Sequence, residues 1–195
     1  TAVVVGAGIT GIECADALNS IGIDTTIVIK KKYVLSSYVD ESEAVFLEGE
    51  ILKSGVAIVK NVYVNEVLQQ KGRVCGLSLS DGIKLKTNLV VFATGVTTNT
   101  QIAGAAGIKI DNDGICVLDT MQTNAENIYA GGDVCRVKNI ITGELIQSCL
   151  WPDAVMQGFV AAQSMVGLTA TFKGAMIVIG INVFGKTISI CNAKN

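Results

Sequence analysis

The sequence predicts an α/β protein with a parallel sheet, and three observations support this prediction. Short apolar, β-branched runs of the kind that form strands buried on both faces alternate with stretches of helical periodicity. A glycine-rich turn joins the first of these runs to the first helical stretch. Hydrophobic side chains make up 50% of the 195 residues and charged ones 16%, so the chain has enough apolar surface to bury a core.

The N-terminal segment predicts a strand, a helix and a second strand. Ala2–Val5 is a continuous apolar run, and Thr25–Ile29 is another. The helix between them carries apolar residues at regular spacing, which are Ile12, Ala15, Leu18 and Ile21. Between the first strand and the helix lies the sequence Gly6-Ala7-Gly8-Ile9-Thr10-Gly11. A GxGxxG pattern at this point of a βαβ unit is typical of dinucleotide-binding domains.

A second helix is expected from Asp40, whose short carboxylate suits an N-cap, with Glu41 and Glu43 favourably placed in the first turn. Its expected buried stripe consists of Ala44, Leu47 and Ile51, with Val45 and Leu52 alongside. Gly55 ends this helix, and Val56–Val59 follows as a third strand.

The next segments alternate in polarity and predict an antiparallel meander. Its three strands are Val62–Leu68, Arg73–Leu79 and Ile83–Lys86. Glycine-containing turns separate them, and the Asp-Gly pair at 81–82 is typical of a tight hairpin. A further apolar strand, Leu89–Ala93, ends at Gly95.

Beyond Gly95 the sequence is rich in Thr, Asn, Gly and Ala, which indicates a crossing between domains over residues 97–116. The short strands expected after it are Ile115–Leu118 and Asn127–Ala130, the second leading into Gly131-Gly132-Asp133. Pro152 stands where a helix begins, and Ala154–Val166 continues that helix. Two closing strands are expected, at Lys173–Gly180 and Ile181–Ile190.

The composition excludes several classes of function. The chain has no histidine, which removes imidazole acid–base catalysis and zinc sites of the Cys/His type. The six cysteines lack paired spacing, and we expect all of them to be small buried apolar side chains in a reducing cytosol rather than metal ligands. A net charge of −2 argues against nucleic-acid binding, and no apolar run spans a membrane or forms a signal peptide. We therefore expect a cytoplasmic protein without metal, nucleic-acid or membrane partners.

The candidate dinucleotide-binding residues are Gly6, Gly8, Ile9, Thr10 and Gly11. Gly6 permits the sharp turn, Gly8 permits close approach of a pyrophosphate, and Gly11 permits close packing of helix on strand. The helix N-terminus then offers unpaired N–H groups and the positive end of its dipole to the phosphates.

The residues after the second strand bear on the choice between NAD and NADP. An acidic residue there binds the ribose 2′-OH, whereas basic residues suit a 2′-phosphate. This chain has Ile29-Lys30-Lys31-Lys32 and no carboxylate. Lys30 and Lys31 therefore favour NADPH over NADH, with an ordinary solvated loop as the alternative.

Several motifs in order resemble the FAD-dependent pyridine nucleotide–disulfide oxidoreductase superfamily. They are Gly6–Gly11 with Ile12-Glu13-Cys14-Ala15, then Ala93-Thr94-Gly95, Thr123–Asp133, and Trp151–Ala154 with Gln157-Gly158. The likeness covers residues 2 to about 167, and its nearest branch includes NADH oxidases, rubredoxin and ferredoxin reductases and the reductase portion of nitrite reductases.

The resemblance implies three parts. Residues 1–100 would form the NAD(P)H-binding domain, residues 101–170 the C-terminal segment of an FAD-binding domain, and residues 171–195 the start of a C-terminal interface domain. The family's N-terminal FAD half is absent from this sequence. The resemblance therefore implies a fragment or subunit whose activity depends on that half or a partner subunit, within a homo-oligomeric parent protein.

The resemblance also implies roles for individual residues. Glu13 matches the family's glutamate near nicotinamide and flavin and is the candidate catalytic residue. Gly95 matches the loop beside the nicotinamide. Gly132 and Asp133 match the loop whose aspartate binds the ribityl chain of FAD. Asp153 and Ala154 match the helix N-terminus at the pyrimidine edge of the flavin. We expect a partly buried Glu13 and a buried Asp133, while ordinary turn, first-turn or N-cap roles remain the alternatives for these acids.

The function implied is a flavoprotein oxidoreductase in which a hydride passes from NAD(P)H to FAD and electrons pass on to an acceptor that the sequence does not identify. The alternatives are a non-catalytic dinucleotide-binding module or redox sensor, and a flavin-free dehydrogenase. A sensor leaves the Asp133 region unexplained. A flavin-free dehydrogenase needs a catalytic acid or base of its own, and the absence of histidine, the most common such group, disfavours it.

Overall fold

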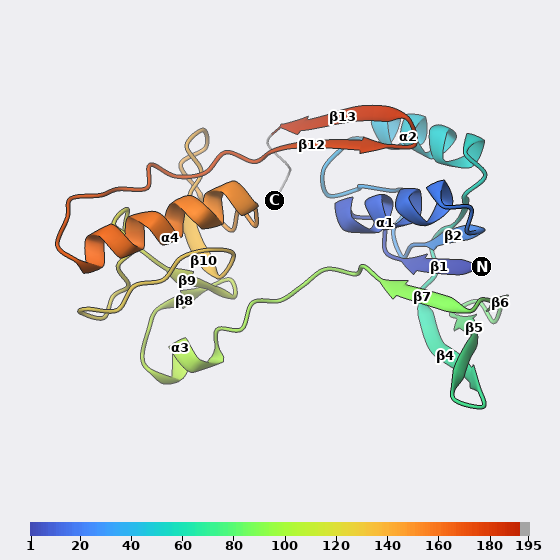
Figure 1. Cartoon of the computed structure of the whole chain (residues 1–195), viewed down its shortest axis with the longest axis horizontal. Helices are drawn as coiled ribbons and strands as arrows, with labels where there is room; N and C mark the ends of the chain where they lie inside the picture. Colours follow the sequence, from blue (N-terminus) through green and yellow to red (C-terminus); the bar gives the residue numbers. More distant parts are fainter. Residues whose placement is uncertain (192–195) are drawn as a thin grey trace. The chain divides into compact units, whose positions relative to one another are not determined.

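A four-stranded parallel sheet in the order β3-β2-β1-β7 forms the centre of the first of two units into which the chain divides. This unit contains Thr1–Gly95 and the chain from Val178 onward, and the second unit contains Val96–Ile177. The computed structural model describes residues 1–191 (Figure 1). The parallel sheet and its flanking helices confirm the predicted α/β class.

The strands of this sheet are β1 Ala2–Val5, β2 Thr25–Val28, β3 Ala57–Val59 and β7 Leu89–Phe92. All of β1 is buried, as its uninterrupted apolar run predicts, and its side chains enter two cores on opposite faces. The helix α1, Ile9–Ser20, connects β1 to β2 and buries Gly11, Ile12 and Ala15.

The helix α2, Glu41–Lys53, begins where the sequence predicts. Asp40 is its N-cap, and the Asp40 carboxylate accepts a hydrogen bond from the Glu43 N–H in a reciprocal capping box. The expectation that Val45 and Leu52 accompany the buried stripe is wrong, since they are 58% and 55% exposed. Their positions lie on the side of the helix opposite Leu47, because the helix has 3.6 residues per turn.

The predicted meander is confirmed as β4 Val64–Gln70, β5 Arg73–Leu79 and β6 Lys84–Lys86, all antiparallel. Leu77 and Leu79 of β5 are fully buried against Val3 and Val5 of β1. The meander thus covers one face of the parallel sheet.

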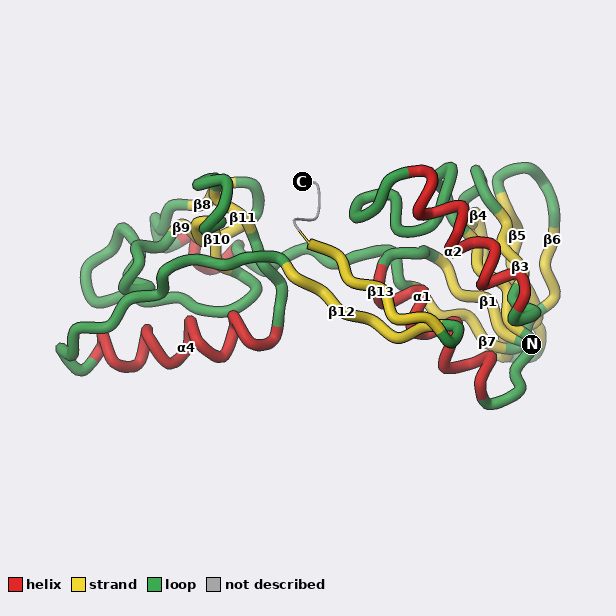
Figure 2. The backbone as a smooth tube through the Cα atoms, turned by 90° about the horizontal axis from the view of Figure 1, so that it is seen from above, coloured by secondary structure: helices red, strands yellow, loops and turns green. Residues whose placement is uncertain are grey.

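A hairpin of β12 Val178–Val183 and β13 Lys186–Cys191 belongs to the first unit (Figure 2). The sequence places a strand boundary between Gly180 and Ile181, which is wrong. The turn is at Phe184-Gly185, where both residues have the positive φ angles of a two-residue hairpin turn. Ile181, Val183 and Ile190 join the core of α1, and the Phe184 N–H donates to Asp16 Oδ1 at 3.0 Å.

The second unit has a small mixed sheet in the order β11-β10-β9-β8, with β8 Ile110–Asp111, β9 Gly114–Cys116, β10 Cys135–Lys138 and β11 Leu145–Ile146. Its helices are α3 Gln101–Ala105 and α4 Trp151–Met165. Pro152 lies in the first turn of α4, as predicted. No helix of residues 1–191 combines the length and apolar character that crossing a membrane requires.

The strand predicted at Asn127–Ala130 does not form. Asn127 has a φ of 61°, a left-handed conformation that interrupts an extended chain, and the segment contributes only the isolated bridge between Gln122 and Tyr129. The elements α3, β8, β10 and β11 are not among those the sequence predicts. Three of them are shorter than a typical strand or helix, so they carry little periodicity.

Candidate functional site

The carboxyl edge of the parallel sheet brings together most of the predicted dinucleotide-binding residues. Gly6 follows β1, Lys30 comes two positions after β2, and Gly95 comes three positions after β7. Because these strands are parallel neighbours, their carboxyl ends meet at one edge. The chain runs from β1 outward to β2 and β3 and then returns to β7 on the other side of β1. Such a reversal is where open α/β sheets bind ligands.

The three glycines of the motif are needed for different reasons. A Cβ added at Gly6 would overlap the Ala93 carbonyl oxygen, and one added at Gly11 would overlap the Gly6 carbonyl oxygen. The packing of the chain itself therefore requires these two glycines. A Cβ added at Gly8 would meet no atom within 4 Å. The space at Gly8 is thus open to a ligand that approaches the backbone closely.

The N-terminus of α1 suits an anionic group. Gly8 is the N-cap and provides no side-chain hydrogen bond, and the first turn contains no acidic residue. Within residues 1–191 the N–H groups of Ile9, Thr10 and Gly11 make no hydrogen bond, as expected for the first turn of a helix. Unpaired N–H groups and the positive end of the helix dipole together favour a phosphate at this position.

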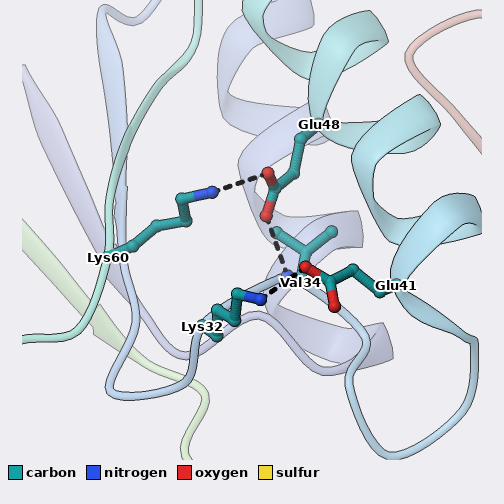
Figure 3. Close-up of polar contacts among 5 residues, drawn as sticks. All are labelled: Lys32, Val34, Glu41, Glu48 and Lys60. Atoms are coloured by element: carbon teal, nitrogen blue, oxygen red, sulfur yellow. Dashed lines mark hydrogen bonds and ion pairs between the residues drawn. The ribbon is translucent and has the colours of Figure 1, made fainter.

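The residues after β2 have separate roles. Ile29 is 4% exposed and belongs to the core, so it cannot contact a ribose, whereas Lys30 and Lys31 are exposed. Lys32 Nζ forms an ion pair with Glu41 Oε1 at 2.5 Å (Figure 3). The hydrogen bond and the charge of Glu41 raise the pKa of Lys32 above its ordinary value. Within residues 1–191 Lys30 and Lys31 have no ion-pair partner, which leaves two ammonium groups for a ligand.

Glu13 and Gly95 are both exposed. The expectation of a partly buried Glu13 is wrong, because Glu13 follows the fully buried Ile12 and the 100° turn per residue directs it outward from α1. Its carboxylate has no hydrogen bond or ion pair within residues 1–191. Gly95 has a φ of 102°, a conformation that glycine adopts without strain.

A second group of predicted residues meets in the second unit. The loop Gly131–Asp133 lies against the first turns of α4, where a Cβ added at Gly132 would be 3.8 Å from the Ala154 Cβ. The Gly132 N–H donates to Gln157 Oε1 at 2.8 Å, and Gln157 is 1% exposed. The loop that carries Asp133 is therefore fixed to α4 by a hydrogen bond to a buried glutamine side chain.

Asp133 is exposed, so the expectation of a buried carboxylate at a strand end is wrong. The strand Asn127–Ala130 does not form, and Asp133 instead lies in the loop that precedes β10. Its backbone carbonyl accepts a hydrogen bond from Gln147 Nε2 at 3.2 Å. The side chain is left accessible at the N-terminal end of α4.

Asp153 lies in the first turn of α4 and is not its N-cap, a position that Leu150 occupies. Its Oδ2 atom is buried and has no hydrogen-bond partner within residues 1–191. A buried carboxylate oxygen without a partner is costly and rare in native proteins. Asp153 is consequently suited to contact a ligand that donates a hydrogen bond.

The expectation that all six cysteines are buried is wrong, because within residues 1–191 only Cys135 is buried and Cys75, Cys149 and Cys191 are exposed. Apolar character alone does not bury a side chain that no other element covers.

Cys149 precedes α4, and its thiol senses the charge of Asp133. Partial burial, and then the negative charge of Asp133, raise the pKa of the Cys149 thiol above its ordinary value. A raised pKa leaves less thiolate, the reactive form, at neutral pH. We expect Asp133→Asn to lower this pKa and to speed alkylation of Cys149 by iodoacetamide at pH 8, as measured by mass spectrometry. The exposed Cys75 of β5 should react at an unchanged rate, and an unchanged rate at Cys149 would contradict an effect of the Asp133 charge on this thiol.

Three polar residues hold these sites without a role assigned to them in the sequence-based prediction, although Gln157 belongs to one of its motifs. Gln157 and Gln147 fix the Asp133 loop, and Glu48 holds the segment after β2. Glu48 and Gln157 lie among buried helix positions, with Leu47 and Ile51 around the first and Val160 and Ala161 after the second. A polar residue at such a position is the signal that could have identified them.

A parallel sheet with an open glycine turn at its switch point defines a dinucleotide-binding α/β protein. The sequence model of the family described as pyridine nucleotide-disulphide oxidoreductase matches residues 1–158. The chain belongs to this family, and the predicted membership is confirmed.

Known proteins similar to this chain include oxidoreductases from several organisms. It is 35% identical over 169 residues to an NADH oxidase of Methanocaldococcus jannaschii, covering 87% of this chain and 37% of the relative. It is 32% identical to the NAD(P)H coenzyme A polysulfide/persulfide reductase of Pyrococcus horikoshii, over 89% of this chain and 39% of that reductase. This chain resembles the crystal structure of an FAD-dependent pyridine nucleotide-disulphide oxidoreductase from Desulfovibrio vulgaris with a TM-score of 0.89 and 31% identity. The match covers 96% of this chain and 48% of that protein.

The chain spans less than half the length of these three proteins. Some relatives are named as subunits, among them an assimilatory nitrate reductase electron transfer subunit of Bacillus subtilis, 32% identical over 73% of this chain. Members of the family therefore occur within multi-subunit systems.

Proposed function

We propose that the chain binds NAD(P)H at its glycine turn and provides part of the flavin site of an FAD-dependent oxidoreductase. The observation that carries the proposal is the open space at Gly8 beside unpaired helix N–H groups. The names of the relatives, which include an NADH oxidase and NAD(P)H-dependent reductases, support a nicotinamide donor. When bound, the nicotinamide would supply a hydride and the flavin would accept it.

The residues of the first unit have distinct proposed roles. Backbone N–H groups of Ile9, Thr10 and Gly11 bind the pyrophosphate, since they are otherwise unpaired. Glu13 and Gly95 contact the nicotinamide end, Glu13 as the candidate catalytic residue. Lys30 and Lys31 bind a 2′-phosphate because they are exposed and unpaired within residues 1–191.

In the second unit the proposed flavin contacts are Gly132 and Asp133 with the ribityl chain, and Asp153 and Ala154 with the pyrimidine edge. The unpartnered Asp153 Oδ2 fits a cofactor that carries an N–H donor at that edge. The N-terminus of α4 adds the positive end of a helix dipole, which favours the negative charge of a reduced flavin.

The remaining wall of the flavin site is proposed to come from polypeptide outside these residues, in the same protein or in a partner subunit. One face of α4 is apolar and exposed, with Trp151 at 79%, Phe159 at 58% and Val166 at 73%. These residues lie on the same side of the helix. A partner polypeptide that covers this face would also reach the N-terminal end of α4.

The experiment that tests this division is reconstitution. We expect the chain alone to bind NAD(P)H weakly and to purify nearly colourless. Addition of a polypeptide that carries the N-terminal FAD half of a family member should give a yellow species that NAD(P)H bleaches, followed by absorbance at 450 nm. Stoichiometric FAD in the chain purified alone would refute the proposal of a divided flavin site.

The two exposed lysines give a prediction about the donor. Lys30→Ala with Lys31→Ala is expected to weaken NADPH binding about tenfold and NADH binding less than about twofold, because exposed ion pairs contribute up to about 1 kcal/mol each. Calorimetric titration of both nucleotides measures this. Lys84→Ala with Lys86→Ala on β6 is the matched control and should change neither affinity. Equal losses for NADPH and NADH in the first variant would assign Lys30 and Lys31 to a solvated loop.

A further inference from the structure

Glu48 is a buried carboxylate in the otherwise apolar stripe of α2. It is 7% exposed, and its neighbours in the stripe are Ala44, Leu47 and Ile51. Burial of a charge costs free energy unless the charge is paired, and an apolar residue at such a place is often as stable or more so. Stability alone therefore does not account for a carboxylate at this position.

The two oxygens of Glu48 join three segments of the chain (Figure 3). Oε1 accepts a hydrogen bond from the Val34 N–H at 3.2 Å, and Oε2 pairs with Lys60 Nζ at 2.8 Å. Val34 lies between β2 and α2, and Lys60 follows β3. The carboxylate thus connects α2 to the segments that leave two neighbouring strands at the carboxyl edge of the sheet.

The segment after β2 is held at further points along its length. The Lys31 carbonyl accepts from the Asn61 N–H at 3.4 Å, and the Leu35 N–H donates to the carbonyl of Ala7 at 2.8 Å. Ala7 belongs to the glycine turn, and Val34 and Leu35 are 0% and 2% exposed. Lys30 and Lys31 are therefore exposed side chains on a backbone fixed on both sides. On their C-terminal side, the Lys32 side chain pairs with Glu41, and Glu48 holds the backbone itself at Val34.

We propose that Glu48 is a positioning residue that sets the preference of this chain for NADPH over NADH. The inference rests on the proposed role of Lys30 and Lys31 at the 2′-phosphate. Loss of the Glu48 carboxylate leaves the Val34 N–H unpaired and releases Lys60. The segment then holds its lysines less firmly, so the 2′-phosphate loses contacts. NADH has no 2′-phosphate and is affected less.

The test compares the affinities of both nucleotides for variants of the whole chain by calorimetric titration. Glu48→Leu is expected to lower the ratio of NADPH to NADH affinity about fivefold, the order expected for loss of one hydrogen-bonded anchor. Glu48→Gln keeps an oxygen acceptor for the Val34 N–H and should keep the ratio within about twofold. Glu50→Gln is the control on the same helix, because Glu50 pairs with Lys53 and Lys186 and does not contact the segment after β2.

A double-mutant cycle separates positioning from general destabilisation. When Lys30 and Lys31 are both alanine, Glu48→Leu should no longer change the ratio, because the groups that it positions are gone. If Glu48→Leu weakens both nucleotides equally and the ratio stays constant, the inference is overturned. If circular dichroism shows that Glu48→Leu does not fold, Glu48→Asp takes its place, since the shorter side chain cannot reach both partners, and an unchanged ratio there overturns the inference. Absence of binding of either nucleotide to the unaltered chain would instead refute the proposed function.

Discussion

Replacement of Gly8 by serine is expected to weaken NADPH binding about a hundredfold while the melting temperature of the chain stays unchanged or rises slightly. A Cβ at Gly8 meets no protein atom within 4 Å, so the fold accommodates the side chain. Serine is also a better N-cap than glycine, and its hydroxyl oxygen would accept a hydrogen bond from an N–H group of the first turn of α1. That side chain would occupy the space of the pyrophosphate and use a donor that the pyrophosphate needs. A loss of about a hundredfold in affinity corresponds to about 3 kcal/mol.

The matched variant Gly11→Ala should instead be less stable than the unaltered chain. Its Cβ would overlap the Gly6 carbonyl oxygen, so α1 must move away from β1 and the free energy of unfolding should fall by about 2–3 kcal/mol. Calorimetric titration with NADPH and thermal unfolding followed by circular dichroism give the two quantities for each variant. Unchanged nucleotide affinity in Gly8→Ser would exclude the glycine turn as the pyrophosphate site.

The first unit could be predicted well because its signals are local. Ala2–Val5, the glycine turn and the Asp40 N-cap each depend on residues within a few positions of one another, and each lies where the sequence predicts it. The exposed Val45 and Leu52 show the limit of such signals. An apolar residue next to a buried stripe is buried only if another element covers it, and sequence periodicity does not contain that information.

The candidate sites were located by their motifs, but their supports could not be predicted. Gln157 binds the N–H of Gly132, which is 25 positions away in the sequence, and Glu48 binds that of Val34, 14 positions away. Such pairs are set by how helices pack on loops. The exposure of Glu13 and Asp133 likewise depends on tertiary surroundings rather than on residue type. In the second unit the strands of two to four residues are too short for periodicity to show.

Replacement of Gln157 by leucine is expected to destabilise the second unit and to release the loop that carries Asp133. Gln157→Leu removes the only side chain within residues 1–191 that pairs with the Gly132 N–H, and this N–H then faces an apolar group. An unsatisfied buried donor costs about 1–3 kcal/mol, and because Gly132 is only half-buried the free energy of unfolding should fall by about 1 kcal/mol, at the low end of that range. The Gly131–Asp133 loop loses its attachment to α4, and Asp133 no longer keeps a fixed place near Cys149.

Two measurements follow from this displacement. In the chain alone, Cys149 should be alkylated faster than in the unaltered chain, because the carboxylate that raises its pKa is no longer held nearby. In the reconstituted protein, flavin retention after gel filtration should fall strongly. Gln163→Leu is the matched control on α4, since the Gln163 side chain makes no hydrogen bond within residues 1–191, and it should change neither quantity. If Gln157→Leu lowers stability but leaves both Cys149 reactivity and flavin retention unchanged, Gln157 is a structural residue of the helix and does not position the Asp133 loop.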